Sequence, residues 1–225
     1  MSSLTLADEL ALLSYDVDGR SQVGRPTLDY ALAGAVVLEL TLAGRLDLAD
    51  GRVRVADPAP TGHPVLDAAL SRAADERRPQ KPKDLVNRLS KGLLDQVLDG
   101  LVAAGVLERR QERVLGLIPR TRFPSPHGVE PQAETEARQR LTAAVLADGP
   151  VEPRTAALCG LVRAAGMERK VFPDQSRRQV NARLAEISAG DWASDATRRV
   201  IQEMQAATIA AITAATVAST TSASS

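Results

Sequence analysis

Side chains able to do acid–base or nucleophilic chemistry are few in this sequence and lie far apart. The two histidines, His63 and His127, each stand beside a proline, and Cys159 is the only cysteine. Neither histidine belongs to a cluster with metal-ligand spacing, and Cys159 lies in an apolar segment with no base near it. Gly19 and Gly24 lack the lysine and the spacing of a phosphate-binding loop. We therefore predict a protein that is not an enzyme and has no catalytic residue, metal or cofactor.

Cations, by contrast, gather in the middle of the chain. Residues 68–128 hold twelve Lys and Arg against seven Asp and Glu, although the whole chain has 28 of each class. The cations of this basic segment include Arg77, Arg78, Lys81, Lys83, Arg88, Lys91, Arg109, Arg110 and Arg113. Such a segment attracts anionic lipid headgroups or a nucleic-acid backbone. The alternative is a solvated face whose long side chains cover apolar surface.

The elements that must position these cations are mostly helices. Hydrophobic residues make up 44% of the chain but aromatic residues only 2%, so the core must consist of Leu, Val and Ala. Helical periodicity and capping signals predict helices at residues 5–15, 26–43, 65–74, 134–147, 154–165, 175–187 and 192–215. Residues 84–104 are predicted as one helix or as two broken near Gly92. We expect a mainly α, single-domain helical bundle over residues 1–215 and a disordered tail over 216–225.

Two helices are each followed by an expected β-hairpin. The first hairpin turns at Asp50-Gly51, a pair that favours tight turns. The second runs from Val106 to Ile118, returning through residues 114–118, and a loop follows over residues 119–131. A helix with a hairpin is typical of proteins that bind a large partner, and a winged-helix nucleic-acid protein is one such class. The helix before the second hairpin shows Asp95, Gln96 and Asp99 instead of a basic row, so nucleic-acid binding is the less favoured alternative. A pure protein-interaction scaffold is a third.

No stretch approaches the roughly 20 apolar residues that cross a bilayer, and the N-terminus lacks the pattern of a cleavable signal. We expect a cytoplasmic protein that attaches peripherally to the inner face of the membrane.

Four segments, in this order, resemble the Golgi phosphoprotein 3 family. They are residues 4–10, residues 38–46, the Pro60-Thr61-Gly62 loop with the helix after it, and residues 101–107. The likeness spans residues 4–215, and the alanine-rich composition resembles a bacterial, actinobacterial-like member. The resemblance implies a mostly helical domain that binds phosphatidylinositol 4-phosphate on membranes and self-associates through a hairpin. In eukaryotes this family retains glycosyltransferases in the Golgi by gripping their cytosolic tails.

The family's headgroup positions fall at Gly24, Ala33, Lys91 and Leu94, of which only Lys91 keeps a cation. The resemblance therefore implies Lys91 as the headgroup residue. The basic segment suggests a looser anionic-lipid patch that adds Lys81, Lys83 and Arg88. The expected partners are an anionic lipid or phosphoinositide, a protein client, and further copies of the chain bound through the Val106–Ile118 hairpin.

Overall fold

The computed structural model describes residues 4–75, 79–114, 118–189 and 195–222. Within these ranges, ten α-helices accompany two separate antiparallel sheets of two strands each. The helices are α1 (Leu6–Ser14), α2 (Arg25–Leu42), α3 (Pro64–Ala74), α4 (Pro82–Leu89), α5 (Leu93–Ala103), α6 (Gln132–Leu146), α7 (Pro153–Ala164), α8 (Glu168–Val171), α9 (Arg177–Ala189) and α10 (Asp195–Ser222). The strands are β1 (Leu46–Ala49), β2 (Arg52–Val55), β3 (Arg110–Val114) and β4 (Ile118–Arg122). The predicted mainly α fold with short hairpins is confirmed.

Helix α1 begins at a reciprocal capping box. The Thr5 hydroxyl accepts a hydrogen bond from the Asp8 amide, and the Asp8 carboxylate accepts one from the Thr5 amide at 2.9 Å. Both side chains satisfy amides that would otherwise lack partners at the helix N-terminus. Every residue of α1 is buried, so this short helix is fixed both by its cap and by the core around it.

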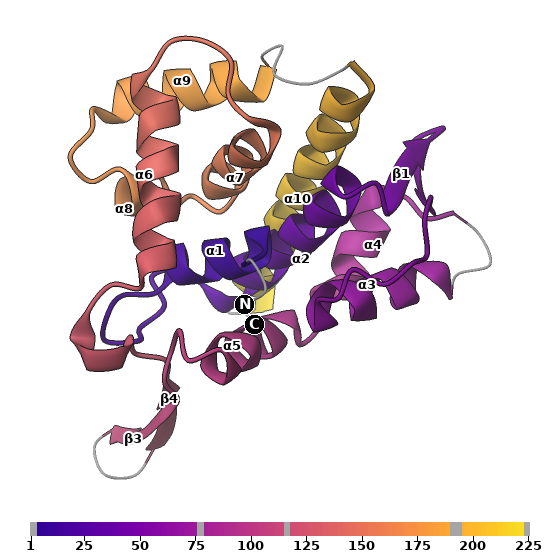
Figure 1. Ribbon diagram of the computed structural model, residues 1–225. Coiled ribbons are helices and arrows are strands. Elements are labelled where there is room, and N and C mark those ends of the chain that lie inside the picture. The colour runs from indigo at the N-terminus through magenta and orange to yellow at the C-terminus, as the bar shows by residue number, and fades with distance from the viewer. Residues whose placement is uncertain (1–3, 76–78, 115–117, 190–194, 223–225) are drawn as a thin grey trace.

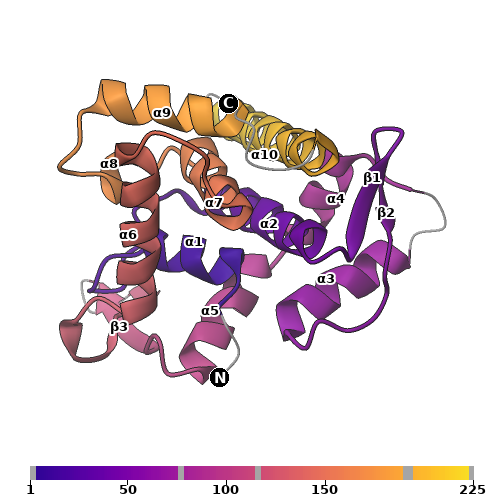
Figure 2. The ribbon, with the colours of Figure 1, turned by 45° about the horizontal axis from the view of Figure 1, so that its top comes forward.

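Helix α2 forms the centre of the molecule. Residues 31–33 and 35–38 are fully buried, a run of Ala, Leu and Val side chains without an exposed stripe, as expected of a helix surrounded on all sides. Helices α1, α7 and α10 pack on α2, as do α3, α4 and α5, and α10 also packs on α4. Figures 1 and 2 show α2 enclosed by these helices.

Two glycines let α10 approach its neighbours closely. A Cβ atom added at Gly34 of α2 would collide with the Thr208 side chain, and one at Gly160 of α7 would collide with Gln205. Thr208 is fully buried, and its hydroxyl donates to the Met204 carbonyl at 2.8 Å, which satisfies it within α10. The absence of a side chain at these two positions therefore sets the distance between α10 and the core.

The first hairpin turns where the sequence predicted. Asp50 and Gly51 have φ angles of 53° and 67°, the left-handed pair that a two-residue hairpin turn requires. The predicted break near Gly92 is also present, because Gly92 has φ 71° and precedes α5. Residues 82–103 therefore form two helices, the second of the two alternatives.

The second hairpin lies later in the chain than predicted. The register pairs Arg110 with Arg122 and Val114 with Ile118, so Val114 ends the outgoing strand instead of beginning the return, and β4 occupies part of the predicted 119–131 loop. The reason is that Val106 and Leu107 belong to the end of α5. The Val106 amide donates to the Leu101 carbonyl at 2.9 Å, and Leu107 is buried. Residues 115–117 lie outside the described residues.

The C-terminal part differs from the prediction at two places, the presence of α8 and the end of α10. The short helix α8 was not predicted. Helix α10 starts at Asp195, and the predicted start at Trp192 lies outside the described residues. Helix α10 also continues to Ser222, past the predicted end at residue 215. There the Thr216 hydroxyl donates to the Ile212 carbonyl at 2.9 Å, so threonines near the end of the helix satisfy their hydroxyls without leaving the helical conformation.

Candidate functional site

Two of the four positions matched to the family's headgroup site are exposed, and the other two are buried. Gly24 is exposed at the N-cap of α2, and Lys91 is exposed in the turn between α4 and α5. Ala33 is 0% exposed and Leu94 is 3% exposed, so neither side chain can reach a ligand in solvent. Lys91 is the single member of the four that combines positive charge with exposure.

The start of α2 near these positions is rich in carboxylates. Arg25 lies 2.5 Å from Asp95 of α5 and 3.7 Å from Asp29 of its own helix. Burial raises the pKa of Asp29, which the nearby Arg25 and the Leu94 amide partly oppose. Asp29 and Asp95 thus hold Arg25 and place negative charge where an anionic headgroup would approach.

The predicted basic patch divides along α4. Lys81 and Lys83 are exposed at its N-terminal end, whereas Lys91 follows its C-terminal end. Eight helical residues at about 1.5 Å each separate the two ends by about 12 Å. Arg88 is half-buried, and its guanidinium donates to the Arg72 carbonyl of α3. Arg77 and Arg78 lie outside the described residues. The structure therefore brings Lys81 and Lys83 together and leaves Lys91 apart.

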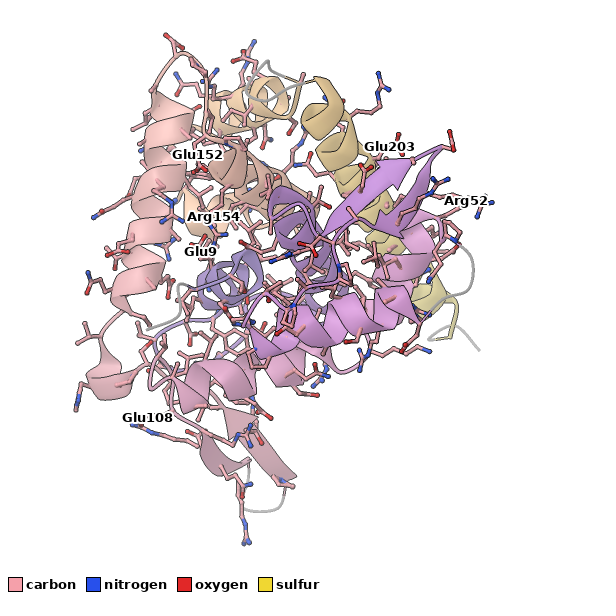
Figure 3. All side chains as sticks on the ribbon, turned by 45° about the vertical axis from the view of Figure 1, so that its right-hand side comes forward. Glu9, Arg52, Glu108, Glu152, Arg154 and Glu203 are labelled. Atoms are coloured by element: carbon pink, nitrogen blue, oxygen red, sulfur yellow. The ribbon has the colours of Figure 1, made fainter. Side chains whose placement is uncertain are left out.

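A cation that the sequence analysis did not select joins this N-terminal end. The Val53 amide of β2 donates to the Gln80 carbonyl at 2.8 Å, forming an isolated antiparallel bridge. Arg52 then stands beside Lys81, and its Nη1 donates to the Pro79 carbonyl at 2.9 Å. Figure 3 shows Arg52 at the outer rim of the molecule, away from Glu9 and Arg154. The alternation of Arg52-Val53-Arg54-Val55 indicates an exposed basic face on this strand. That Lys81 lies beside Arg52 is visible only in the folded structure.

The cations near the second hairpin are largely paired. Arg109 forms an ion pair with Asp99 and lies 5.6 Å from the centre of the Phe123 ring. Arg110 pairs with Glu108 at 2.7 Å, and Arg122 pairs with Glu112 at 2.7 Å. Phe123 also packs edge-to-face on Tyr15 with ring centres 6.2 Å apart, which anchors the base of the hairpin.

The side chains able to do chemistry do not form a catalytic group. Cys159 is buried, and burial raises the pKa of its thiol to about 12, so it is not a nucleophile at neutral pH. His63 Nε2 lies 3.5 Å from Asp8, whereas His127 is exposed on a separate turn. Within the described ranges, no group of three or more His, Cys, Asp or Glu side chains could hold a metal ion.

Half-buried and buried charges instead hold the N-terminal segment in place. Arg154 of α7 donates to the Leu4 carbonyl at 2.8 Å and to Glu9 at 3.2 Å, and it also contacts Glu39 of α2. Glu39 in turn accepts from the Leu6 amide at 2.6 Å. Figure 3 shows Glu9 and Arg154 close together in the interior. Each charge has a partner of opposite sign, as an ion removed from water needs. The cluster therefore holds the N-terminal segment against α2 and α7.

No helix in the described part of the chain is long and apolar enough to cross a membrane. A model of the Golgi phosphoprotein 3 (GPP34) family matches residues 6–204, in agreement with the likeness seen in the sequence. No curated protein matches the chain.

Proposed function

The chain belongs to the Golgi phosphoprotein 3 (GPP34) family, and on this premise we propose that it is a non-enzymatic, peripheral membrane adaptor. It attaches reversibly to anionic lipid on the cytoplasmic face of the membrane and presents the rest of its surface to a protein client. The observation that carries the proposal is the exposure of Lys81 and Lys83 without an ion-pair partner among the described residues.

We propose that the attachment depends on charge and is not selective for phosphatidylinositol 4-phosphate. A phosphate monoester carries a charge of about −1.5 to −2 and is held by several charge-assisted donors. Of the four family positions, Gly24 and Ala33 offer no side-chain donor, Leu94 is apolar, and only Lys91 remains. Each cation near an anionic surface contributes about 1 kcal/mol, so several lysines together suffice for weak, reversible binding.

The experiment is vesicle co-sedimentation of the full chain and of a variant in which Lys81, Lys83, Arg88 and Lys91 are each changed to Glu. We expect the variant to lose binding to phosphatidylglycerol vesicles, because attraction becomes repulsion. The matched control reverses four exposed cations on other elements, Arg113, Arg120, Arg163 and Arg178. Undiminished binding by the first variant would remove this surface as the site.

Winged-helix binding of nucleic acid remains the competing function. The side chains of Asp95 and Asp99 on α5, the helix before the second hairpin, are 59% and 58% exposed, which disfavours contact with a polyanion. A steep dependence of duplex DNA binding on salt concentration would favour that alternative, whereas failure to bind either DNA or vesicles would favour a scaffold.

A further inference from the structure

The bridge between β2 and residue 80 places two cations side by side. Val53 pairs with Gln80 in the antiparallel sense, so the residue before Val53 on β2, Arg52, lies opposite the residue after Gln80, Lys81. Directly opposite residues of antiparallel strands point to the same face with Cβ atoms about 4.5–5.5 Å apart. Both side chains are exposed. Like charges in this position repel one another and attract an anion between them.

Arg54, the next arginine on the same strand, differs from Arg52 in having an acidic partner. Arg54 lies opposite Asp47 of β1 and forms a 3.4 Å ion pair with Asp50. Arg52 instead lies opposite Ala49 of β1. In the described part of the chain, no carboxylate forms an ion pair with Arg52, Lys81 or Lys83. The two arginines therefore share a strand and a face, but only Arg54 is neutralised.

The chain after Lys81 adds a third cation. Pro82 begins α4, and no side chain caps the helix at Lys81, its N-cap residue. Lys83 is exposed in the first turn, with Asp84 as the acidic residue of that turn. The N-terminus of a helix carries partial positive charge, which adds to that of the three basic side chains.

We propose that Arg52, Lys81 and Lys83 form a binding site for a phosphate group between β2 and the start of α4. The Arg52 guanidinium is oriented by the hydrogen bond from its Nη1 to the Pro79 carbonyl at 2.9 Å, and its other N–H groups are donors that suit phosphate oxygens. The two lysines supply point charges on flexible stems. The site is separate from Lys91. As a site for a lipid headgroup, it rests on the proposed membrane attachment and supplies a defined contact for it. The phosphate belongs either to a lipid headgroup or to a soluble phosphate ester.

The experiment compares Arg52→Gln with Arg54→Gln as a matched control from the same strand face. In one arm, binding to phosphatidylglycerol vesicles is measured by co-sedimentation. In the other arm, inorganic phosphate is titrated and the backbone amide NMR shifts are followed for the residues from 80 to 84 other than Pro82, which has no amide hydrogen. We expect Arg52→Gln to weaken both kinds of binding about fivefold, corresponding to about 1 kcal/mol for one cation, and Arg54→Gln to leave them nearly unchanged. Arg52→Lys should restore vesicle binding in part.

The outcomes separate this inference from the proposed function. Equal losses in the two variants, or no loss in either, would overturn the site and leave only diffuse attraction. Vesicle binding that depends on Lys91 but not on Arg52 would keep membrane attachment and refute the site. Phosphate shifts at residues 80–84 that Arg52→Gln abolishes, without vesicle binding by the wild type, would support a site for a soluble phosphate ester and refute membrane attachment. Circular dichroism of each variant verifies that it is folded.

Discussion

Glu134 is a buried carboxyl group whose pKa is raised into the neutral range. Its side chain is 7% exposed, and Arg138 of the same helix lies 2.6 Å away. Burial, followed by repulsion from Glu130, raises the pKa of Glu134 to about 7, against the attraction of Arg138 and Lys170. Lys170 lies in the same cluster, and burial lowers its pKa to about 8. The cluster links α6 and α8 to the end of α1, because Lys170 donates to the Tyr15 carbonyl at 2.6 Å.

This cluster predicts a pH dependence of stability. The folded chain binds the Glu134 proton more tightly than the unfolded chain, so the Glu134 contribution to stability falls as pH rises from 4.5 through about 7. Glu134→Gln removes that dependence because an amide does not ionise. We expect the variant to gain stability relative to the wild type as the pH is raised across this window, below the titration of Lys170.

Urea denaturation at several pH values between 5 and 7.5 measures this difference. Glu136→Gln is the matched control because it removes an exposed carboxylate from the same helix. A constant difference between wild type and Glu134→Gln at all pH values would contradict the raised pKa.

The sequence alone does not reveal that Arg52 belongs with Lys81 and Lys83. Lys81 and Lys83 stand out in the sequence because other cations lie close to them in the chain. Arg52 stands 29 positions before Lys81, and on its strand it alternates with Arg54, whose ion-pair partner Asp50 lies two residues before Arg52. Its proximity to Lys81 depends on one backbone bridge formed in the folded chain, which neither periodicity nor charge counting reveals.

At the scale of elements, the contact between α10 and α2 depends on the absence of a side chain at Gly34. In Gly34→Ala the new methyl group meets Thr208, which is fully buried and cannot move into solvent. We expect a loss of about 1–3 kcal/mol in the free energy of unfolding, typical of overpacking, measured by chemical denaturation.

Gly100→Ala is the matched control for this change. Gly100 lies inside α5, is exposed, and has nothing within 4 Å of an added Cβ. Alanine there should stabilise the protein by up to about 1 kcal/mol, through helix propensity alone. Equal effects of the two substitutions would contradict the close packing of α10.

The β3–β4 hairpin is the element that we expect to mediate self-association. Figure 1 shows it projecting from the helical body, and unpaired strand edges favour pairing with another chain. Replacing residues 112–120 by Asn-Gly joins Gln111 to Thr121, which are partners in the register, through a two-residue turn. We expect the variant to sediment as a smaller species with unchanged helix content. An unchanged sedimentation coefficient, after allowance for the shorter chain, would remove the hairpin from the interface.

The sequence predicts those elements whose signals are local. The Thr5–Asp8 cap, the Asp50-Gly51 turn and the Gly92 break each depend on residues within a few positions of one another, and the structure contains all three. The second hairpin was misplaced because the apolar residues Val106 and Leu107 suggest a strand, yet they complete the end of α5 and the core. The extent of α10 was missed because Thr and Ser near a chain end resemble a tail.

On the scale of the whole molecule, the charges divide into two groups. Largely buried ion pairs lie inside the helical body: Arg154 of α7 with Glu9 of α1 joins two helices, whereas Arg138 with Glu134 lies within α6. The cations at the start of α4 and on β2 face solvent at the end of the molecule that carries β1, β2, α3 and α4 (Figures 1 and 2). This division supports attachment through one end of a rigid helical body.

The most direct test of this account is co-sedimentation of the wild-type chain with vesicles of neutral lipid, phosphatidylglycerol or phosphatidylinositol 4-phosphate, each at low and moderate salt. We expect binding to both anionic vesicles at matched surface charge, loss of this binding as salt rises, and no binding to neutral lipid. Absence of binding to anionic vesicles at low salt would contradict membrane attachment. Salt-resistant binding to phosphatidylinositol 4-phosphate alone would contradict the proposal that attachment is unselective.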